Sequence, residues 1–271
     1  MAWRNTQYAF LHAARDAGAS AITCANTFAT TGPKDFLIDD RAGSLATFTA
    51  AATDHYIQLD RGAGTLEEID RIIIPAGHNY NGHNLRVRTD SASDFSVDPT
   101  EILAKTAISA ATIIDLAMTG GTEAQRKYRY VRIDDDDAES WNPEIPELIL
   151  TRTRTLTRGP EPNWEDYPTH NTLHFPKESG AIASLSLGAD RRYFAFVYRN
   201  VKDSDDLAVF SELIAEVGTS RPFYLDPPFD TEAAVWVKLI EDVRQSQDRL
   251  YPAGTDSYRP EIPLRMLEHL A

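Results

Sequence analysis

Short runs of alternating side chains fill the first half of this 271-residue chain, and they constrain its fold more than any other feature. The runs are rich in β-branched and aromatic residues, and turn-forming Gly, Asn, Asp and Pro separate them. They span residues 45–50, 55–60, 70–75, 84–90, 127–134 and 147–158. Their spacing does not suit βαβ units, so they predict an antiparallel β-sandwich.

A proline-rich stretch divides the chain. GPEPNWEDYPTHNTLHFP, at residues 159–176, carries four prolines and no periodicity, which is typical of a linker. We therefore predict a β-sandwich domain at residues 1–158, a linker at 159–180 and a second domain at 181–271. The run TRTRTLTR, at 151–158, alternates without an apolar face, and we expect an exposed strand that leaves the sandwich.

The second domain combines strands with one clear helix. Residues 182–188 and 191–201 predict paired strands, and RYFAFVY is apolar on both faces, as expected for a strand buried on both sides. Residues 204–218 predict a helix with Ser204 as N-cap, apolar side chains at helical spacing and Gly218 at its end. Two further strands and a last strand with a short terminal helix follow, so we predict an α+β domain.

Two segments have conflicting or short signals. Residues 8–18 favour a short helix. Residues 99–118 leave helix and strand open, because their alanines favour a helix while their isoleucines and threonines favour a strand. The fold class is mainly β in either case.

The charge of the chain restricts its partners. The formal net charge is −14 and the pI is near 4.9, so nucleic-acid binding over the whole surface is disfavoured, although a local basic patch stays open. Cys24 is the only cysteine, which excludes an intramolecular disulfide and a cysteine-based zinc site, and we expect a small core residue. No secretory signal and no membrane span are visible, which predicts a protein made in a cytoplasm.

Catalytic motifs of specific spacing are absent from the sequence. It has no G-x-S-x-G elbow, no phosphate-binding G-x-x-x-x-G-K-[ST] loop and no H-E-x-x-H helix, so we expect neither a catalytic site nor a cofactor. Four consecutive aspartates, Asp134 to Asp137, follow a strand, and such oxygen-rich loops bind calcium. The EF-hand spacing is missing, so we expect a solvated turn instead.

GHNYNGHN, at residues 77–84, places two histidines among asparagines and glycines that tolerate positive φ and cap turns. No third strong zinc ligand is evident nearby, so we expect a turn between two strands rather than a metal site. Trp141 and Trp164 lie in proline-containing loops, where a ring can stack on a sugar, whereas Trp236 is expected in the core. The candidates for contact with a partner or a glycan are His78, Asn79, Tyr80, Asn81, His83 and Trp141.

Part of the first domain resembles the galactose-binding-like, or discoidin-type, jelly roll. FLIDDRAGSLATFT and HYIQLDRGAGTLEEIDRIIIPAGHNYNGHNLRVRTDS follow its order of strands and turns, within residues 20–155. Ile57, Leu59 and Asp60 match one strand of the pattern, although Arg61 replaces a hydrophobic residue. Further matches are Ile72, Ile73, Ile74, Leu85, Val87, Tyr130 and Val131. The resemblance implies a jelly-roll sandwich, and because the ligand loops of this family vary, it implies no particular sugar-binding residue.

The second half resembles the hub domain of distal tail and minor tail proteins of long-tailed bacteriophages. RRYFAFVYRNV, SDDLAVFSELIAEVG, TSRPFYLDPPFD and AAVWVKL follow the pattern of that family over residues 180–271. The matching positions are Arg191, Phe194, Phe196, Leu207, Phe210, Leu213, Pro222, Phe223, Leu225, Asp226 and Trp236. The resemblance implies a tail-hub-like domain that packs into homo-oligomeric rings, with packing roles for these residues.

Together the two resemblances imply a structural protein of the virion, at the tail tip or baseplate of a long-tailed bacteriophage. Its partners would be other tail proteins, and its sandwich would contact a host-surface glycan. Arg152, Arg154 and Arg158 of the exposed strand would pair with acidic residues of a neighbouring chain, with a solvated edge as the alternative. We expect no enzyme. The alternatives are a glycoside hydrolase or esterase with a jelly-roll accessory domain, and a lectin-like module.

Overall fold

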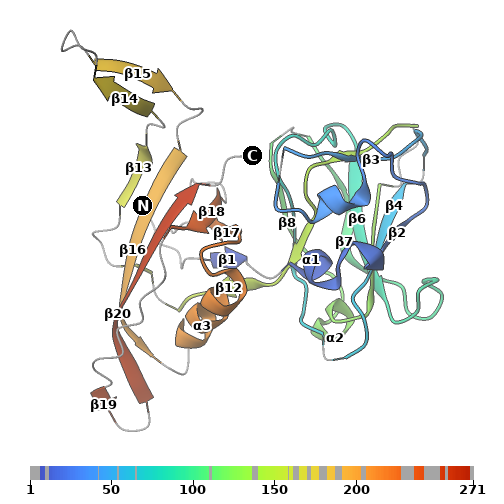
Figure 1. Ribbon diagram of the computed structural model, residues 1–271. Coiled ribbons are helices and arrows are strands. Elements are labelled where there is room, and N and C mark those ends of the chain that lie inside the picture. Colours follow the sequence, from blue (N-terminus) through green and yellow to red (C-terminus); the bar gives the residue numbers. More distant parts are fainter. Residues whose placement is uncertain are drawn as a thin grey trace. The chain divides into compact units, whose positions relative to one another are not determined.

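A computed structural model divides the chain into two compact units, residues 11–153 and residues 1–10 together with 154–270 (Figure 1). It describes residues 7–9, 12–41, 43–53, 55–64, 66–109, 112–135, 140–157, 159–160, 165–169, 172–176, 182–186, 191–202, 206–226, 235–240, 251–253 and 256–268. The first ten residues group with the second unit, because β1 (Gln7–Ala9) pairs with β17 (Phe223–Asp226). This division differs from the sequence-predicted boundary, which places 1–158 in one domain.

The first unit is an antiparallel β-sandwich. Its sheets have the strand orders β2-β4-β9-β6-β7 and β11-β5-β8. The larger sheet contains β2 (Ile22–Cys24), β4 (Tyr56–Asp60), β9 (Tyr130–Asp134), β6 (Asn84–Asp90) and β7 (Thr100–Ala107). The smaller sheet contains β11 (Ile149–Thr151), β5 (Arg71–Ile74) and β8 (Ile114–Ala117). The ambiguous segment 99–118 thus forms two strands, because burial of its isoleucines outweighs the helix propensity of its alanines.

Short elements complete this unit. They are α1 (Ala13–Ala17), η1 (Ala19–Ala21), η2 (Lys34–Leu37), β3 (Ala46–Thr47), α2 (Glu123–Arg126) and β10 (Glu144–Ile145). β3 pairs with β10. The helix that the sequence predicts over 8–18 is therefore confined to α1, since β1 takes residues 7–9 into a sheet.

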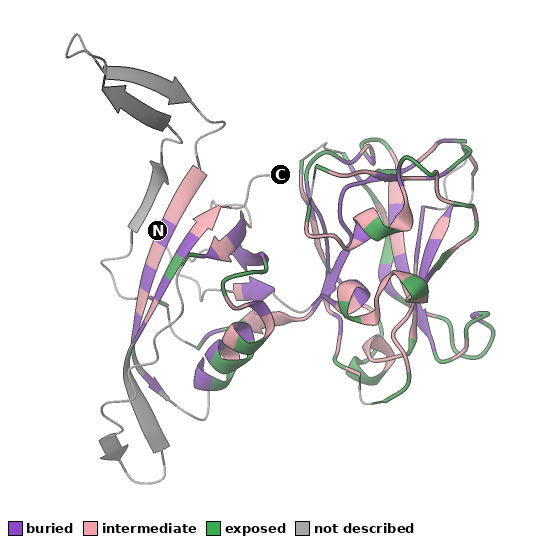
Figure 2. Ribbon diagram, in the orientation of Figure 1, coloured by how far each residue is buried: buried purple, intermediate pink, exposed green. Residues whose placement is uncertain are grey.

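Alternation along the strands builds the core between the two sheets, as the purple segments of Figure 2 show. Ile57 and Leu59 of β4 and Val131 and Ile133 of β9 are each at most 2% exposed. Arg132, which lies between the last two, points to the other face and is only half-buried. Burial of each such aliphatic side chain contributes about 1.5–3 kcal/mol, so the period-two pattern fixes which face is inside.

The second unit contains an eight-stranded sheet of order β12-β1-β17-β18-β20-β16-β13, with β19 paired to β20 beside this path. Its remaining strands are β12 (Thr153–Thr155), β13 (Glu165–Thr169), β16 (Arg191–Lys202), β18 (Val235–Leu239), β19 (Tyr251–Ala253) and β20 (Asp256–Glu268). β14 (Thr172–Pro176) and β15 (Ile182–Ser186) form a separate hairpin. With α3 (Asp206–Val217) between β16 and β17, the unit is α+β, as predicted.

The helix α3 packs against this sheet through aromatic rings. Phe210 of α3 lies 6.4 Å from Tyr8 of β1 and 5.0 Å from Tyr198 of β16, measured between ring centroids. The two tyrosine hydroxyls are 2.8 Å apart and buried. The helix ends where predicted, at Gly218, whose φ of 52° is one that glycine adopts without strain. The predicted N-cap, Ser204, lies outside the described residues.

Only one face of β16 is fully buried. Phe194 and Phe196 are 0% exposed, whereas Tyr193, Ala195 and Val197 on the opposite face are half-buried. The sequence prediction of burial on both sides therefore holds for one face only. An apolar side chain can face solvent in part, so apolar sequence alone does not fix burial.

Strands also occupy part of the predicted linker at 159–180. β13 and β14 lie within it, and β13 contains Pro168. Because β13 is the edge strand of the sheet, the missing N–H of a proline can be accommodated there without breaking the ladder. Similarly, β20 continues to Glu268, although the sequence predicts a last strand followed by a short terminal helix over residues 257–270.

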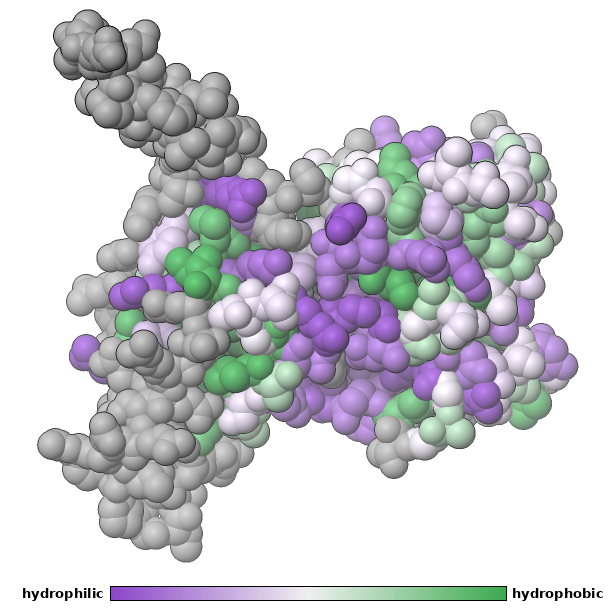
Figure 3. Space-filling model, in the orientation of Figure 1, coloured by the Kyte–Doolittle hydropathy of each residue, from purple (hydrophilic) through white to green (hydrophobic). Residues whose placement is uncertain are grey.

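Hydrophilic side chains cover much of the visible face of the sandwich unit, while apolar side chains form patches on the second unit (Figure 3). Among the described residues, no helix has both the length and the apolar character needed to cross a membrane.

Candidate functional site

Loops meet at one end of the sandwich. β2 ends opposite the start of β4, with Cys24 paired to Ile57, and β9 ends beside the start of β6, with Asp134 paired to Arg86. The described residues next to these strand ends are 25–34, 48–53, 55, 75–83 and 140–142, which we call the Trp141 end. All six loop residues singled out in the sequence lie there: His78, Asn79, Tyr80, Asn81, His83 and Trp141.

A cavity of about 530 Å³ opens at the Trp141 end. Its polar and aromatic lining consists of Thr23, Asn26, Thr27, Phe28, Thr30 and Lys34, and its remaining lining of Ile22, Cys24, Ala25, Ala29 and Pro33. None of these residues is Asp or Glu. The volume lies within the range of small-ligand sites, about 300–1,000 Å³.

Main-chain hydrogen bonds hold the cavity lining in place. Ala29 N donates to Thr47 O at 2.8 Å, Thr47 N donates to Gly32 O at 2.9 Å, and Thr49 N donates to Thr27 O at 2.9 Å. A Cβ on residue 32 would lie 2.4 Å from Thr47 Oγ1 and 2.9 Å from Thr47 N, so only glycine allows this close approach. The cavity is therefore built into the backbone pairing of the fold.

Phe28 is supported from behind by two further rings. It stacks on Phe48 with ring centroids 4.6 Å apart, and Phe48 stacks on His55 with centroids 4.5 Å apart. Phe48 and His55 are each 3% exposed, whereas Phe28 is half-buried. Aromatic stacking contributes about 0.5–1.5 kcal/mol per pair. Phe28 is thus a fixed aromatic ring in the cavity wall.

His55 connects the cavity to the Trp141 loop. Its Nε2 is 2.8 Å from the carbonyl oxygen of Trp141, and its Nδ1 is 3.1 Å from Nδ2 of Asn26. We assign the tautomer in which Nε2–H donates to Trp141 O and Nδ1 accepts from Asn26. Ala52 N, which lies 3.1 Å from Nε2, then donates to Trp141 O at 3.0 Å instead. The bond from Asn26 Nδ2 to His55 Nδ1 fixes the Asn26 amide, which is one of the polar groups of the cavity lining.

Hydrogen bonds within the segment and to neighbouring loops fix the first half of GHNYNGHN. His78 is 4% exposed, its Nδ1 accepts from Tyr80 N at 3.2 Å, and its Nε2 donates to Thr112 O at 2.6 Å. Burial lowers the pKa of His78, which keeps the ring neutral. Asn79 donates to Asn142 O at 2.9 Å. The segment joins β5 to β6, so the predicted turn between two strands is confirmed.

Trp141 is packed rather than open. The ring of His83 stacks on it with centroids 3.7 Å apart, Tyr80 contacts it edge-on at 5.0 Å, and its Nε1 donates to Asp135 at 2.8 Å. Trp141 is only 8% exposed, whereas His83 is half-buried and Asn81 is exposed. Of the predicted contact residues, Asn81 is therefore exposed, and Asn79 is half-buried like His83.

The sequence predicts a solvated turn for the aspartate run that begins at the end of β9, and this prediction is wrong for its first two residues. Asp134 is 7% exposed and pairs with Arg86 at 2.6 Å and Arg88 at 2.8 Å, because its side chain points across the sheet face. Asp135 is 2% exposed and accepts from Trp141. The last two lie outside the described residues. No group of three or more His, Cys, Asp or Glu in the described part of the chain is arranged to hold a metal.

The predicted interchain arginines have partners within the chain. Arg152 pairs with Glu67 at 2.8 Å and Arg154 pairs with Glu212 at 2.8 Å. Arg158 lies outside the described residues. The predicted continuous strand is interrupted at Arg152, between β11 and β12.

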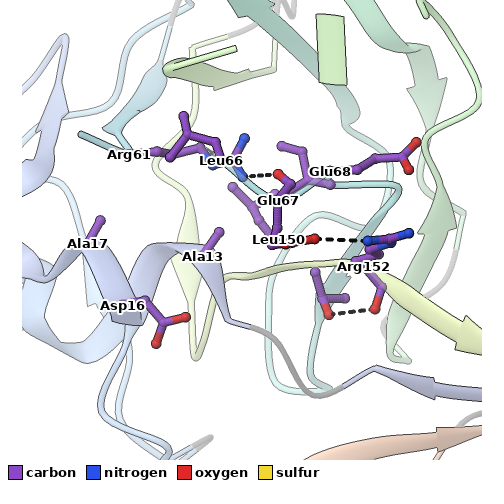
Figure 4. A pocket seen from close by; sticks show the side chains of 11 residues that line it. Ala13, Asp16, Ala17, Arg61, Leu66, Glu67, Glu68, Leu150 and Arg152 are labelled. Atoms are coloured by element: carbon purple, nitrogen blue, oxygen red, sulfur yellow. Dashed lines mark hydrogen bonds and ion pairs between the residues drawn. The ribbon is translucent and has the colours of Figure 1, made fainter. Parts of the chain in front are cut away.

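A smaller cavity of about 220 Å³ lies in the same unit, between α1, the loop before β5, and β11 (Figure 4). Ala13 and Ala17 of α1 form part of its apolar wall. Glu67 and Arg152 at its rim pair with each other. Arg61 donates to main-chain carbonyls, and burial lowers its pKa to about 10. Because these rim groups are already bonded, the larger cavity offers a ligand more polar contacts.

Comparison with known proteins finds no matching family model and no matching curated protein. Chitosan-binding module 1 of a chitosanase/glucanase from Paenibacillus sp. IK-5 is similar over 52% of this chain and 99% of the module, with 12% identity and a TM-score of 0.41. A GH29 fucosidase from Ruminococcus gnavus is similar over 53% of this chain and 27% of its own, with 16% identity and a TM-score of 0.40.

A third similar structure is a CBM32 domain, CpGH89CBM32-5 from Clostridium perfringens, in complex with GalNAc-β-1,3-galactose. It is covered over 94% of its length and matches 48% of this chain, with 13% identity and a TM-score of 0.38. At this level of likeness these structures assign no ligand to this chain. The comparisons give no support to the resemblance to bacteriophage tail proteins.

No sequence motif points to the residues of the larger cavity. Phe28 and Asn26 lie in ANTFATTGPKD, where only TTGPKD stands out, as a turn cluster. The available signal is an aromatic residue among small polar residues before a Gly-Pro turn. Such stretches are common in loops, so the signal acquires meaning only with the backbone pairing that shapes the cavity.

Proposed function

We propose that the sandwich unit is a carbohydrate-binding module whose ligand occupies the cavity lined by residues 22–34. The observation that carries this proposal is Phe28, an aromatic ring fixed in the cavity wall next to amide and hydroxyl groups. A pyranose ring has an apolar C–H face and a rim of hydroxyls, so it uses both kinds of contact. The polar partners would be Asn26, Thr27 and Thr30.

The rigidity of the cavity supports this proposal. Ring stacking holds Phe28, a bond to His55 holds Asn26, and main-chain bonds hold the turn up to Gly32. Sugars bind weakly per contact because their hydroxyls exchange water bonds for protein bonds of similar strength. A lining that is already ordered loses little conformational entropy on binding, which favours such ligands.

We propose a binding role and not an enzymatic one for this cavity. Glycoside hydrolysis uses two carboxyl groups, about 5–9 Å apart, on either side of the bond that breaks. The lining of the cavity contains neither Asp nor Glu. Half-buried His83 and exposed Asn81, which lie at the same end of the sandwich as the cavity, would extend the contact surface for a longer glycan.

A glycan-array screen followed by isothermal titration with the best oligosaccharide tests this proposal. Phe28→Leu keeps apolar volume on Phe48 but removes the aromatic face, so we expect an affinity loss of about tenfold or more with little change in melting temperature. Val97→Ala, at a position 69% exposed and outside the cavity, serves as the control. Equal affinities for wild type and Phe28→Leu would exclude this cavity as the site.

We also propose that the second unit is an assembly domain, in the role implied by the resemblance to phage tail-hub domains. The supporting observation is a half-buried, mainly apolar sheet face. It carries Tyr193, Ala195 and Val197 of β16 beside Pro263 and Leu267 of β20, with exposed Arg265 opposite Ala195. In this role the protein would be part of a virion tail, made in the host cytoplasm, with other tail proteins as partners. Light scattering and electron microscopy of the purified chain are expected to reveal ring-shaped oligomers, and a strict monomer at high concentration would contradict the role.

A further inference from the structure

The cavity of residues 22–34 differs in charge from the chain as a whole. The protein carries 41 Asp and Glu against 27 Lys and Arg, a formal net charge of −14. The cavity lining has no carboxylate and one ammonium group, that of Lys34. A negatively charged ligand group would therefore be attracted at this place and repelled by the average surface.

The ammonium group of Lys34 is held at a defined point of the lining. Lys34 begins η2, directly after Pro33, and its Nζ donates to Ile22 O at 2.9 Å. Among the described residues, no carboxylate forms an ion pair with it. An ammonium group has three N–H bonds, so two remain for a ligand. Lys34 is thus a positioned cation without a counter-charge in the described part of the chain.

The other polar groups of the lining are neutral. Asn26 supplies an amide, and Thr27 and Thr30 supply hydroxyls, which both donate and accept. Cys24 adds no charge, because burial raises the pKa of its thiol. A ligand that uses the whole lining therefore needs an apolar ring face for Phe28, hydroxyls for these neutral groups and an anionic group for Lys34.

We propose that the module selects acidic sugars, whose carboxylate or sulfate binds the Lys34 ammonium while the ring lies on Phe28. This inference rests on the proposed carbohydrate-binding function and narrows its ligand class. Neutral sugars would bind more weakly, because they leave the ammonium group to water. Amino sugars such as chitosan oligosaccharides would be rejected, because they bring a second positive charge into a cavity without a carboxylate.

Titration calorimetry of the full chain against four oligosaccharides of equal length tests the selection: oligogalacturonate, sulfated galactan, neutral galactan and chitosan oligosaccharides. We expect one or both acidic ligands to bind about tenfold more tightly than the neutral one, as a charge-assisted bond gives. The comparison of the first two ligands tells whether carboxylate or sulfate is preferred. Affinity for the acidic ligand should fall as salt rises, whereas that for the neutral ligand should not.

Substitution of Lys34 separates charge from folding. Lys34→Gln should remove the preference for acidic ligands without lowering affinity for the neutral one, and Lys34→Arg should keep the preference. Melting temperatures of both variants establish that the fold is intact. Equal binding of acidic and neutral ligands by the wild type, with loss in Phe28→Leu, would overturn the acidic preference alone. Absence of binding to every sugar would overturn this inference together with the proposed function.

Discussion

The imidazole of His83 lies flat on the indole of Trp141, with ring centroids 3.7 Å apart and ring planes 6° apart. It covers a face of a tryptophan that is only 8% exposed. We expect His83→Ala to lower the free energy of unfolding by about 0.5–1.5 kcal/mol, since it removes the stack. Water would then reach the indole, so the tryptophan emission of the variant should shift to longer wavelengths than that of wild type.

Asn81→Ala is a suitable control for this substitution. Asn81 lies in the same turn but is exposed. Its removal should change neither the melting temperature nor the emission. If His83→Ala leaves the emission unchanged, the ring of His83 is not what shields Trp141 from water.

The sandwich follows closely from its sequence pattern, because alternation determines which face of a strand is buried. Ile57 and Leu59 of β4 illustrate this, as does the III run of β5. The turn with His78 could be predicted too, since asparagine and glycine favour turns over metal sites. By contrast, burial of Asp134 could not be predicted, since its arginine partners come from another strand.

The candidate cavity depends on contacts that no local pattern encodes. Thr27 and Ala29 pair with main-chain groups about twenty residues away, at Thr49 and Thr47. The edge position of β13, which lets it hold Pro168, likewise depends on the order of strands in the sheet. The positions of proline and glycine in a sequence therefore indicate turns reliably only where the neighbouring strands are already known.

Gly32 provides a test of the backbone origin of the cavity. Gly32→Ala places a methyl group 2.4 Å from Thr47 Oγ1, so the turn must move away from β3. We expect a loss of stability of about 1–3 kcal/mol and weaker sugar binding. Gly43→Ala is the matched control, because a Cβ there meets no atom within 4 Å. Thermal unfolding and titration of both variants decide the point, and equal melting temperatures would contradict it.

His12 and Glu147 form a buried pair at 3% and 0% exposure, with Nε2 and Oε1 3.0 Å apart. Because Nδ1 of His12 accepts from Arg15 N at 3.2 Å, the ring proton is on Nε2 and the imidazole is neutral. Burial, reinforced by the charges of Asp40 and Asp39, raises the pKa of Glu147 to about 9. The folded protein therefore keeps a proton on this carboxyl at neutral pH.

This proton makes stability depend on pH. The unfolded chain releases it near pH 4, at about the ordinary glutamate pKa of 4.3. The stabilisation is complete below that pH and is lost progressively as pH rises toward 9, because only the unfolded state is then deprotonated. We expect Glu147→Gln, which stays neutral and still accepts from His12, to be more stable than wild type at pH 8 by about 1–3 kcal/mol.

At pH 4 the gain from Glu147→Gln should disappear. Chemical denaturation at the two pH values measures the difference, with Glu144→Gln, at an exposed position nearby in the sequence, as the control. An equal effect of Glu147→Gln at both pH values would mean that the carboxyl is ionised in the folded protein.

Substitution of Asp134 tests whether this aspartate stabilises the fold through its arginine partners. Its carboxylate bridges Arg86 and Arg88, so Asp134→Ala leaves two partly buried guanidinium groups without this partner. We expect a loss of about 2–4 kcal/mol in the free energy of unfolding. Removal of Glu123, which forms an exposed pair with Lys127, should leave the melting temperature unchanged.

EDTA should have no effect on the melting temperature of wild type, because the oxygens of Asp134 already bind arginines. A large fall in melting temperature with chelator would instead identify the aspartate run as a calcium site.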